Sequence, residues 1–522
     1  MRYGFVIDNR RCIGCHACTV ACKAEHNVPV GVSRTWVKTV EKGVFPNTRR
    51  IFAVHRCNHC GDAPCVQICP VTALFTRRDG IVDFDSRRCI GCKSCMQACP
   101  YDALYIDPET HTSAKCNYCA HRIDSGLEPA CVIVCPVHAI VSGDMENPAS
   151  EIARVLSRQQ VVPRKPEKNT LPNLFYIDGD HAALRPEQAP AATEFSAVAQ
   201  ATGVGHYAAF ASRPPHQGSL RSPAARAKVL GLPGGSAGGE GAAAGGGPPA
   251  NGSGNPDGAA AFAAPAGAAR RTYDAPAKGV LWDWEVSGYL WSKSIAAGAL
   301  FLPLALELGG ALTLPDRLSR VLVVLSLLFL GLTGALLVKD LDRPERFLYV
   351  LLRPNWRSWL VRGAYIITGF GGVSFLWGLH LFAGGTLLSG AGLALVKGLL
   401  LVLGVLAAVY TAFLFAQARA RDLWQSPLLP FHMLIASAMT GGAVALLVAH
   451  LGGLAPAAVL AAALQGAIVL NLALLALELG AQHASHDSAA AIHQITRGAL
   501  ALPFWAALLL GNLAPLAMLW LR

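Results

Sequence analysis

The chain has 522 residues, of which 53% are hydrophobic and 15% charged, and its formal net charge is +11. This composition is typical of a membrane protein and argues against a single soluble domain. The positive charges lie in a cysteine-rich region and in loops between apolar stretches. They therefore favour a role in membrane topology or in contact with an acidic partner over nucleic-acid binding.

All sixteen cysteines lie between Cys12 and Cys135. The N-terminal stretch before them, MRYGFVIDNRR, has no apolar core or cleavage site, so we expect no secretory signal. A disulfide scaffold would be shorter and would not gather its cysteines into four similar runs. The runs are Cys12, Cys15, Cys18, Cys22; Cys57, Cys60, Cys65, Cys69; Cys89, Cys92, Cys95, Cys99; and Cys116, Cys119, Cys131, Cys135.

The last three runs end in a cysteine followed by proline, at Pro70, Pro100 and Pro136. Run three has the C-x2-C-x2-C-x3-C-P pattern of bacterial ferredoxins, run two has it with two extra residues, and run four has it with a long insert. In that pattern the fourth cysteine ligates the neighbouring cluster, and runs work in pairs. Zinc ribbons also use CxxC pairs, but they have no need of the final cysteine and proline. Sixteen cysteines suffice for four [4Fe–4S] clusters without an open iron site. The region is thus predicted to carry electrons, with no catalytic residue of its own.

The chain divides into three regions by composition. Residues 1–190 are predicted to form the iron–sulfur domain, and residues 191–280, rich in Ala, Gly and Pro, a flexible linker. Residues 281–522 contain seven apolar segments long enough to cross a bilayer, at about 286–311, 318–338, 361–382, 391–417, 428–450, 455–480 and 498–520. The predicted fold is an α+β ferredoxin-like domain of two paired dicluster modules, followed by an all-α transmembrane bundle.

The charged residues of the membrane half are unevenly distributed. The side on which the first span begins, here called the near side, carries nine Lys or Arg residues in its loops, and the other side carries three. This predicts a cytoplasmic near side, with the iron–sulfur domain on the same face of the inner (cytoplasmic) membrane. The nine are Lys339, Arg343, Arg346, Arg353, Arg357, Arg362, Arg419, Arg421 and Arg497, and the three are Arg317, Arg320 and Arg522.

Three stretches, CNHCGDAPCVQICPVTALF, GIVDFDSRRCIGCKSCMQACPYDALYID and KCNYCAHRIDSGLEPACVIVCPVHAI, resemble the four-cluster iron–sulfur subunits of the DMSO reductase and polysulfide reductase type. The resemblance implies that run one pairs with run four and run two with run three. The implied ligand sets are Cys12, Cys15, Cys18 with Cys135; Cys116, Cys119, Cys131 with Cys22; Cys57, Cys60, Cys65 with Cys99; and Cys89, Cys92, Cys95 with Cys69.

KDLDRPERFLYVLLRPNWRSWLVRGAYI and VYTAFLFAQARARDLWQSPLLPFHMLIAS resemble the NrfD-like membrane subunit of polysulfide reductase, which implies a quinone, menaquinone or ubiquinone, bound in the bundle near the iron–sulfur domain. Tyr410 matches the quinone-contacting tyrosine of that family, and Lys293 falls near its polar position in the first span. Ionisable residues inside a membrane are candidates for function, so His432 and Glu478 join the predicted quinone site. Asp340 and Arg343 are expected to shape the loop and to clamp the iron–sulfur domain.

Four residues near the other side of the membrane allow two interpretations each. Glu307 and Lys397 are expected to form an ion pair, with a proton path as the alternative. His380 and His450 would suit a b-type haem, with packing or interface residues as the alternative, and the family resemblance argues against the haem. After the sixth span, His483, His486 and His493 are expected to lie in a solvated loop.

These observations predict an electron-transfer and membrane-anchor subunit of a respiratory oxidoreductase complex. Electrons would pass between quinone or quinol and a catalytic partner, which the resemblance implies is a molybdenum or tungsten pterin subunit of the DMSO reductase superfamily. One alternative is the same quinone-linked chain serving a multihaem cytochrome. Another is a non-enzymatic redox-sensing or assembly protein of the membrane.

Overall fold

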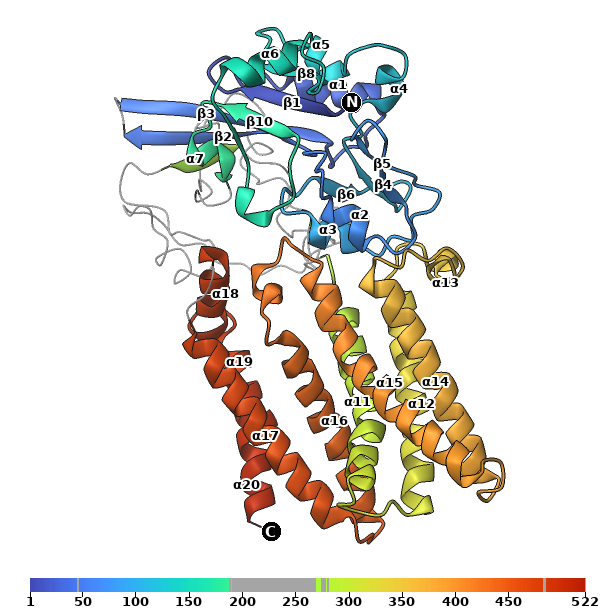
Figure 1. Cartoon of the computed structure of the whole chain (residues 1–522). Helices are drawn as coiled ribbons and strands as arrows, with labels where there is room; N and C mark the ends of the chain where they lie inside the picture. Colours follow the sequence, from blue (N-terminus) through green and yellow to red (C-terminus); the bar gives the residue numbers. More distant parts are fainter. Residues whose placement is uncertain are drawn as a thin grey trace, which may run out of the picture. The chain divides into compact units, whose positions relative to one another are not determined.

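The computed structural model describes residues 1–44, 47–186, 189, 269–273, 278, 281–481 and 485–521 (Figure 1). The predicted linker, residues 191–280, lies outside the described residues except for 269–273 and 278. The chain forms two compact units. The first comprises Met1–Trp36, Val54–Gly179 and Val280–Arg522, and the second Val37–Ala53 and Asp180–Gly279. The first unit therefore contains parts of both predicted folded domains.

A four-stranded sheet in the order β8-β1-β10-β9 belongs to the first unit. β1 (Tyr3–Asp8) runs parallel to β10 (Leu174–Ile177) and antiparallel to β8 (Ile140–Asp144), and β9 (Val161–Pro163) pairs antiparallel with β10. Helix α6 (Glu151–Arg158) buries Ile152 in an apolar cluster with Val6 of β1. The sheet thus joins the two ends of the cysteine-rich sequence.

Cysteine runs two and three repeat one local structure. Helices α2 (Pro64–Ile68) and α3 (Ser94–Ala98) end just before Cys69-Pro70 and Cys99-Pro100, because a residue that precedes proline is forced out of the helical region. Each Cys-Pro is followed by a hairpin, β4 (Leu74–Thr76) with β5 (Val82–Phe84), or β6 (Leu104–Ile106) with β7 (Ser113–Lys115). Runs one and four carry α1 (Ala17–Glu25), α4 (Ala120–Ile123) and α5 (Ala130–Ile133). The predicted ferredoxin-like fold is confirmed.

The second unit contains most of a three-stranded sheet in the order β11-β2-β3. Its strands are β2 (Thr35–Val44), β3 (Asn47–Arg56) and β11 (Arg270–Tyr273), the last of which falls within the sequence interpreted as linker. Val40 and Ile51 pack against alanines of helix α7 (His181–Leu184).

Seven helical segments of the described chain are long and apolar enough to cross a membrane, which confirms the predicted bundle. They are α11 (Trp284–Leu308), α12 (Asp316–Lys339), α14 (Trp359–Phe382), α15 (Gly390–Ala416), α16 (Leu429–Leu451), α17 (Ala457–Gly480) and a seventh span that joins α19 (Ala501–Leu508) to α20 (Ala514–Trp520). The protein is therefore a multi-pass membrane protein.

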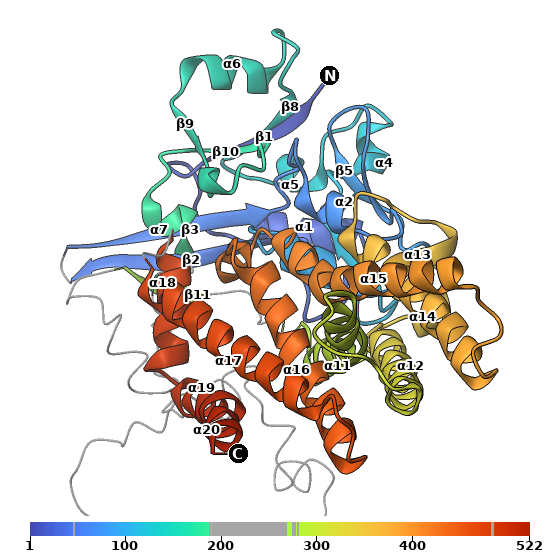
Figure 2. The same cartoon turned by 60° about the horizontal axis from the view of Figure 1, so that its bottom comes forward.

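Helix α11 is the most buried span and packs against α12, α15 and α16 (Figure 2). The closest approach is to α16, where a Cβ on Gly298 or Gly441 would overlap the backbone of the other helix. At one edge of the bundle, α17 packs against α16 and contacts α20. Short helices occupy the near-side loops: a 3-10 turn (Pro344–Arg346), α13 (Tyr349–Leu352) and a 3-10 turn (Asp422–Gln425).

The expectation of a solvated loop after the sixth span is wrong for residues 486–496, which form helix α18 (His486–Thr496). Ser485 and Ser488 form a capping box, in which the side chain of each serine bonds the backbone N–H of the other. Of the histidines in that loop, His486 and His493 lie on α18, and His483 lies outside the described residues.

Candidate functional site

The four cysteine runs share one backbone turn. Between the first two cysteines of each run, the second residue has a positive φ, a left-handed conformation that reverses the chain. This turn points the N–H groups of His59 and Gly91 at the Sγ atoms of Cys57 and Cys89, at 3.5 and 3.4 Å. The four φ angles are 69° at Gly14, 44° at His59, 71° at Gly91 and 62° at Tyr118.

We group the sixteen thiols into the four sets of four that the family resemblance implies, and number the sets from the membrane bundle outward. Burial raises the pKa of the Cys92, Cys65, Cys22 and Cys12 thiols, and neighbouring thiolates of the same set act in the same direction. The first set is Cys69, Cys89, Cys92 and Cys95; the second is Cys57, Cys60, Cys65 and Cys99; the third is Cys22, Cys116, Cys119 and Cys131; the fourth is Cys12, Cys15, Cys18 and Cys135. The assignment of each cysteine to its set stays a prediction.

The thiols of the first set are placed as a cluster would need them. All four line one small cavity, beside Pro70 and Ser113. Backbone N–H groups also reach the sulfur atoms, as Ser113 does for Cys89 at 3.4 Å and Ala139 for Cys135 at 3.2 Å. A cubane needs thiolates at four separated corners and gains from such hydrogen bonds.

The sets follow one another in order. The first and second sets exchange a cysteine between runs two and three. Cys116 of the third set interacts with Cys57 of the second, and Cys18 of the fourth with Cys131 of the third. Cys15 of the fourth set is exposed. The series therefore begins at the membrane loops and ends at the surface of the iron–sulfur domain.

Three side chains from the membrane half hold the backbone of the first set. Each donates a hydrogen bond to the carbonyl oxygen of a different cysteine, so the loops fix the position of this set relative to the bundle. The bonds run from Asn355 Nδ2 to Cys69 at 2.8 Å, from Arg346 to Cys89 at 3.0 Å and from Trp282 Nε1 to Cys92 at 3.1 Å.

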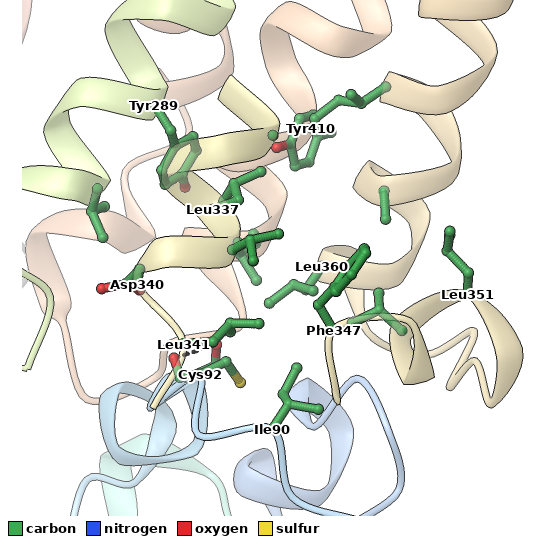
Figure 3. A pocket seen from close by; sticks show the side chains of 18 of the residues that line it. Ile90, Cys92, Tyr289, Leu337, Asp340, Leu341, Phe347, Leu351, Leu360 and Tyr410 are labelled. Carbon is green, nitrogen blue, oxygen red and sulfur yellow. Dashed lines mark hydrogen bonds between the residues drawn. The ribbon is translucent and has the colours of Figure 1, made fainter. Parts of the chain in front are cut away.

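A pocket of about 250 Å³ lies where the first set meets the bundle (Figure 3). Its walls are mostly apolar, with Phe347 and Leu414 among them. Tyr289 of α11 and Tyr410 of α15 line the bundle side, whereas Cys92 and Ile90 lie on the iron–sulfur side. A cysteine of the first set and two tyrosines thus border one cavity.

Of the predicted quinone residues, Tyr410 lines this pocket and Lys293 lies directly beside it. Lys293 is buried, its Nζ lies 4.6 Å from the centre of the Tyr410 ring, and it donates hydrogen bonds to Thr411 Oγ1 at 2.7 Å and Ala408 O at 3.1 Å. These bonds direct its ammonium group into helix α15. Lys293 is therefore a neighbour of the pocket and not one of its lining residues.

His432 and Glu478 lie elsewhere. Their side chains, on α16 and α17, approach each other to 2.9 Å, and neither is among the residues that line the pocket. The sequence places His432, Glu478 and Tyr410 on the same side of the membrane, which does not show that only Tyr410 lines the pocket. Tyr289, which sequence reasoning missed, occupies the pocket instead. It precedes Lys293 by four residues, so helical spacing alone would have placed it on the same face.

The predicted roles of Asp340 and Arg343 separate. Arg343 does clamp the iron–sulfur domain, since its guanidinium donates two hydrogen bonds to Thr110 O at 2.9 and 2.6 Å. The carboxylate that clamps is Asp342, which pairs with Lys93 at 3.0 Å. Asp340 lines the pocket and is half-buried. The pKa of the Asp340 carboxyl is raised to about 6, chiefly by burial; Lys93 lowers it, and Glu285 and Asp342 raise it.

On the other side of the bundle, Lys397 Nζ donates to Glu307 Oε2 at 2.7 Å, which confirms the expected ion pair. His380 is buried, and its Nδ1 accepts a hydrogen bond from the backbone N–H of Leu388 at 3.2 Å, while His450 is exposed on α16. One ring nitrogen of His380 is thus already occupied by a hydrogen bond from the loop that follows the helix.

The ferredoxin-like fold and the thiol sets define an iron–sulfur electron-transfer protein joined to a membrane bundle. Models of the 4Fe-4S dicluster domain match residues 11–74 and 48–145, and a model of the polysulphide reductase NrfD family matches residues 274–522. This protein belongs to the family of 4Fe–4S iron–sulfur subunits of the polysulfide reductase type. In this chain the subunit is fused to an NrfD-type membrane domain.

Known relatives match the iron–sulfur part. The B subunit of tetrathionate reductase from Salmonella typhimurium is 46% identical over 189 residues, which are 35% of this chain and 76% of the relative. The corresponding polypeptide of Wolinella succinogenes polysulfide reductase is 41% identical over 188 residues, 35% of this chain and 97% of the relative. A Halobacterium salinarum protein described as the iron–sulfur subunit of a dimethyl sulfoxide reductase is 37% identical over 214 residues, 35% and 82% of the two chains.

Proposed function

We propose that this subunit passes electrons between a membrane quinone and a catalytic partner through four [4Fe–4S] clusters, one for each thiol set. The observation that carries the proposal is the pocket bordered by both Cys92 and Tyr410. A redox carrier bound there would lie beside the first cluster. When bound, menaquinone or ubiquinone supplies a carrier of two electrons and two protons that dissolves in the bilayer.

The residues of the pocket suit such a ligand. Apolar walls accept a ring and an isoprenoid chain, and a few polar groups fix orientation. The hydroxyl groups of Tyr289 and Tyr410 can donate hydrogen bonds to quinone carbonyls. Asp340 can exchange a proton in the same cavity, because its raised pKa lies close to the working pH. Binding, orientation and proton exchange thus fall to these three residues.

The exposed end of the series suits a protein partner. Around Cys15 and the fourth set, the apolar side chains of Ile13, Val20 and Ile133 are exposed to 54, 65 and 58%. Clustered exposed apolar residues mark interaction sites. We infer that a molybdenum or tungsten pterin subunit of the DMSO reductase superfamily docks here, because relatives of this chain are subunits of tetrathionate and polysulfide reductases.

We further infer that the near side of the inner membrane faces the cytoplasm, from the excess of Lys and Arg in its loops. A protease that cleaves the 191–268 segment tests this inference in sealed vesicles. Cleavage in inverted vesicles and protection in right-side-out vesicles is the expected result. The reverse pattern would place the iron–sulfur domain on the outer face.

The quinone site is tested by Tyr410→Phe, which removes one hydroxyl from the pocket. We expect about 10- to 100-fold slower reduction of the iron–sulfur clusters by a quinol analogue, with unchanged iron content. Tyr349→Phe is the matched control, since Tyr349 lies on the loop helix α13 and does not line the pocket. Equal rates in wild type and Tyr410→Phe would remove Tyr410 from the site.

The partner is tested by extraction of the complex in mild detergent, followed by measurement of molybdenum, tungsten and iron. A pterin subunit that co-purifies with its metal is the expected result. Haem-stained protein in place of that subunit, with no molybdenum or tungsten, would instead favour a multihaem cytochrome partner.

A further inference from the structure

Arg56 is a buried cation between two thiol sets. Its side chain is 1% exposed, and one amino group donates to Cys131 Sγ of the third set at 2.8 Å. Its guanidinium carbon lies 4.7 Å from the centre of the Phe5 ring. Among the described residues, Nε and the other amino group of Arg56 have no hydrogen-bond partner. An arginine is always protonated, and a buried charge is costly unless negative charge lies nearby.

The negative charge near Arg56 comes from the sulfur ligands. Its guanidinium interacts with Cys131 and Cys116 of the third set and with Cys18 of the fourth. The described residues around it otherwise offer an aromatic ring and no carboxylate bond. The positive charge of Arg56 is therefore balanced by the negative charge of the cysteine thiolates and of the cluster that they would hold.

Lys115 is a second buried cation beside the third set. It is 0% exposed, and its Nζ donates hydrogen bonds to the backbone oxygens of Val82 and of Cys116, the latter at 2.9 Å. It also interacts with Cys57 and Cys65 of the second set. The third set therefore borders both Arg56 and Lys115, whereas the second borders Lys115.

Side chains also bond the sulfur atoms of the third set. His26 Nε2 lies 3.2 Å from Cys119 Sγ, and His59 Nε2 lies 3.7 Å from Cys116 Sγ. With Arg56 at Cys131, three of the four sulfur atoms of the third set have a nitrogen neighbour. In the first set, the corresponding neighbour is the neutral hydroxyl of Ser113, 3.2 Å from Cys95 Sγ.

Cations near the first set are placed differently. Lys93 pairs with Asp342, which offsets its charge, and Arg346 bonds the backbone instead of sulfur. Burial does not distinguish the first three sets, since nearly all their thiols are buried. The difference between them is thus Arg56, an unpaired positive charge beside the third set that the first two sets lack, whereas Lys115 borders the second set as well.

We propose that Arg56, together with Lys115, raises the reduction potential of the cluster held by the third set above those of the two clusters nearer the membrane. The inference rests on the proposed assignment of one cluster to each thiol set. Reduction adds one electron and one negative charge without moving an atom. A nearby buried cation stabilises that charge, and hydrogen bonds to sulfur act in the same direction. An electron delivered from quinol would then rest at the third set before it leaves through the fourth.

The test is a redox titration of the full-length protein in detergent, followed by electron paramagnetic resonance. Cys119→Ser identifies the signal of the third cluster. We expect Arg56→Gln to shift the midpoint potential of that signal downward, Arg56→Lys to retain most of the wild-type value, and the signals of the first two clusters to move little. Arg87→Gln is the control, because Arg87 lies two residues from Cys89 with 89% of its side chain exposed and should be screened by water.

Two measurements keep this inference separate from the assignment of clusters. The iron content and the reduced spectrum of the wild-type protein report whether four clusters are present. If they are, unchanged potentials in an iron-replete Arg56→Gln protein would overturn the role of Arg56. If Arg56→Gln fails to retain iron, Lys115→Gln replaces it. This variant removes the second buried cation beside the third set and should lower the potential of the same signal, and an unshifted signal would overturn the proposal.

Discussion

The ring of Tyr410 packs against α14 at Gly363, where any Cβ would overlap the ring. Gly363→Ala therefore has to displace Tyr410 from its place in the pocket. We expect quinol-dependent cluster reduction to slow by about 10- to 100-fold, because displacement of a binding group by about 1 Å has effects of this size. Gly372→Ala on the same helix is the control, since nothing lies within 4 Å of its added Cβ. Wild-type kinetics in Gly363→Ala would show that the ring can move without consequence.

Asp340 supplies the carboxyl group among the residues that line the pocket, and the charges that face it are Glu285, Asp283, Asp342 and Lys93. Because burial raises its pKa to about 6, the carboxylate form predominates only above that pH. Only this form can accept a proton from a quinol, so the rate of quinol oxidation should rise as the pH passes through about 6. In Asp340→Asn this rise should vanish. A pH profile that keeps its shape in the variant would assign the proton transfer to another group.

At the scale of whole elements, the crossing of α11 and α16 depends on glycines. A Cβ on Gly441 would overlap the backbone of α11 at Gly298 and Ala299. Gly441→Ala should therefore separate the two helices and cost about 1–3 kcal/mol of stability. Thermal unfolding in detergent measures this loss. Gly466→Ala on α17 should have no such effect, because nothing lies within 4 Å of its added Cβ.

The transmembrane helices were predictable because length and apolarity alone define a span, and their observed bounds lie within a few residues of the expected ones. Helix α18 was not predictable, because its residues are too polar to suggest burial and its start depends on the Ser485–Ser488 capping box.

The turns of the cysteine runs follow from CxxC spacing. The pairing of Lys93 with Asp342, instead of Asp340, depends on the path of a short loop, which no periodicity encodes.

The residues that line the pocket were also only partly predictable from the sequence. Tyr410 was found through resemblance, whereas Tyr289 and Asp340 enter the pocket through the packing of α11 on α15 and of α12 on α11 and α14. Arg56 ends a strand and reads in sequence as an ordinary basic residue of β3. Its burial between thiol sets depends on contacts with residues 75 positions away, which only the folded chain brings together.

For the whole molecule, the contacts between the near-side loops and the iron–sulfur domain predict what happens when the chain is cut between its iron–sulfur and membrane halves. Ser358 and Asn355 bond the carbonyls of Ile68 and Cys69 at 2.7 and 2.8 Å, and Arg421 bonds Gln97 at 2.7 Å. We expect a protein cut within residues 191–268 to remain associated, so that a tag on one half co-purifies the other. Dissociation at physiological salt would show that these contacts need the covalent link.

The exchange of cysteines between runs has a consequence for how the protein is made. The fourth thiol set combines Cys12, Cys15 and Cys18 with Cys135, and the third takes Cys22 together with cysteines of run four. The first cysteines to leave the ribosome therefore have no complete site until more than a hundred further residues have been synthesised. With the proposed assignment of ligands, iron insertion into the third and fourth sets would follow translation of the entire cysteine-rich sequence, and the earliest thiols would need protection from oxidation during that interval.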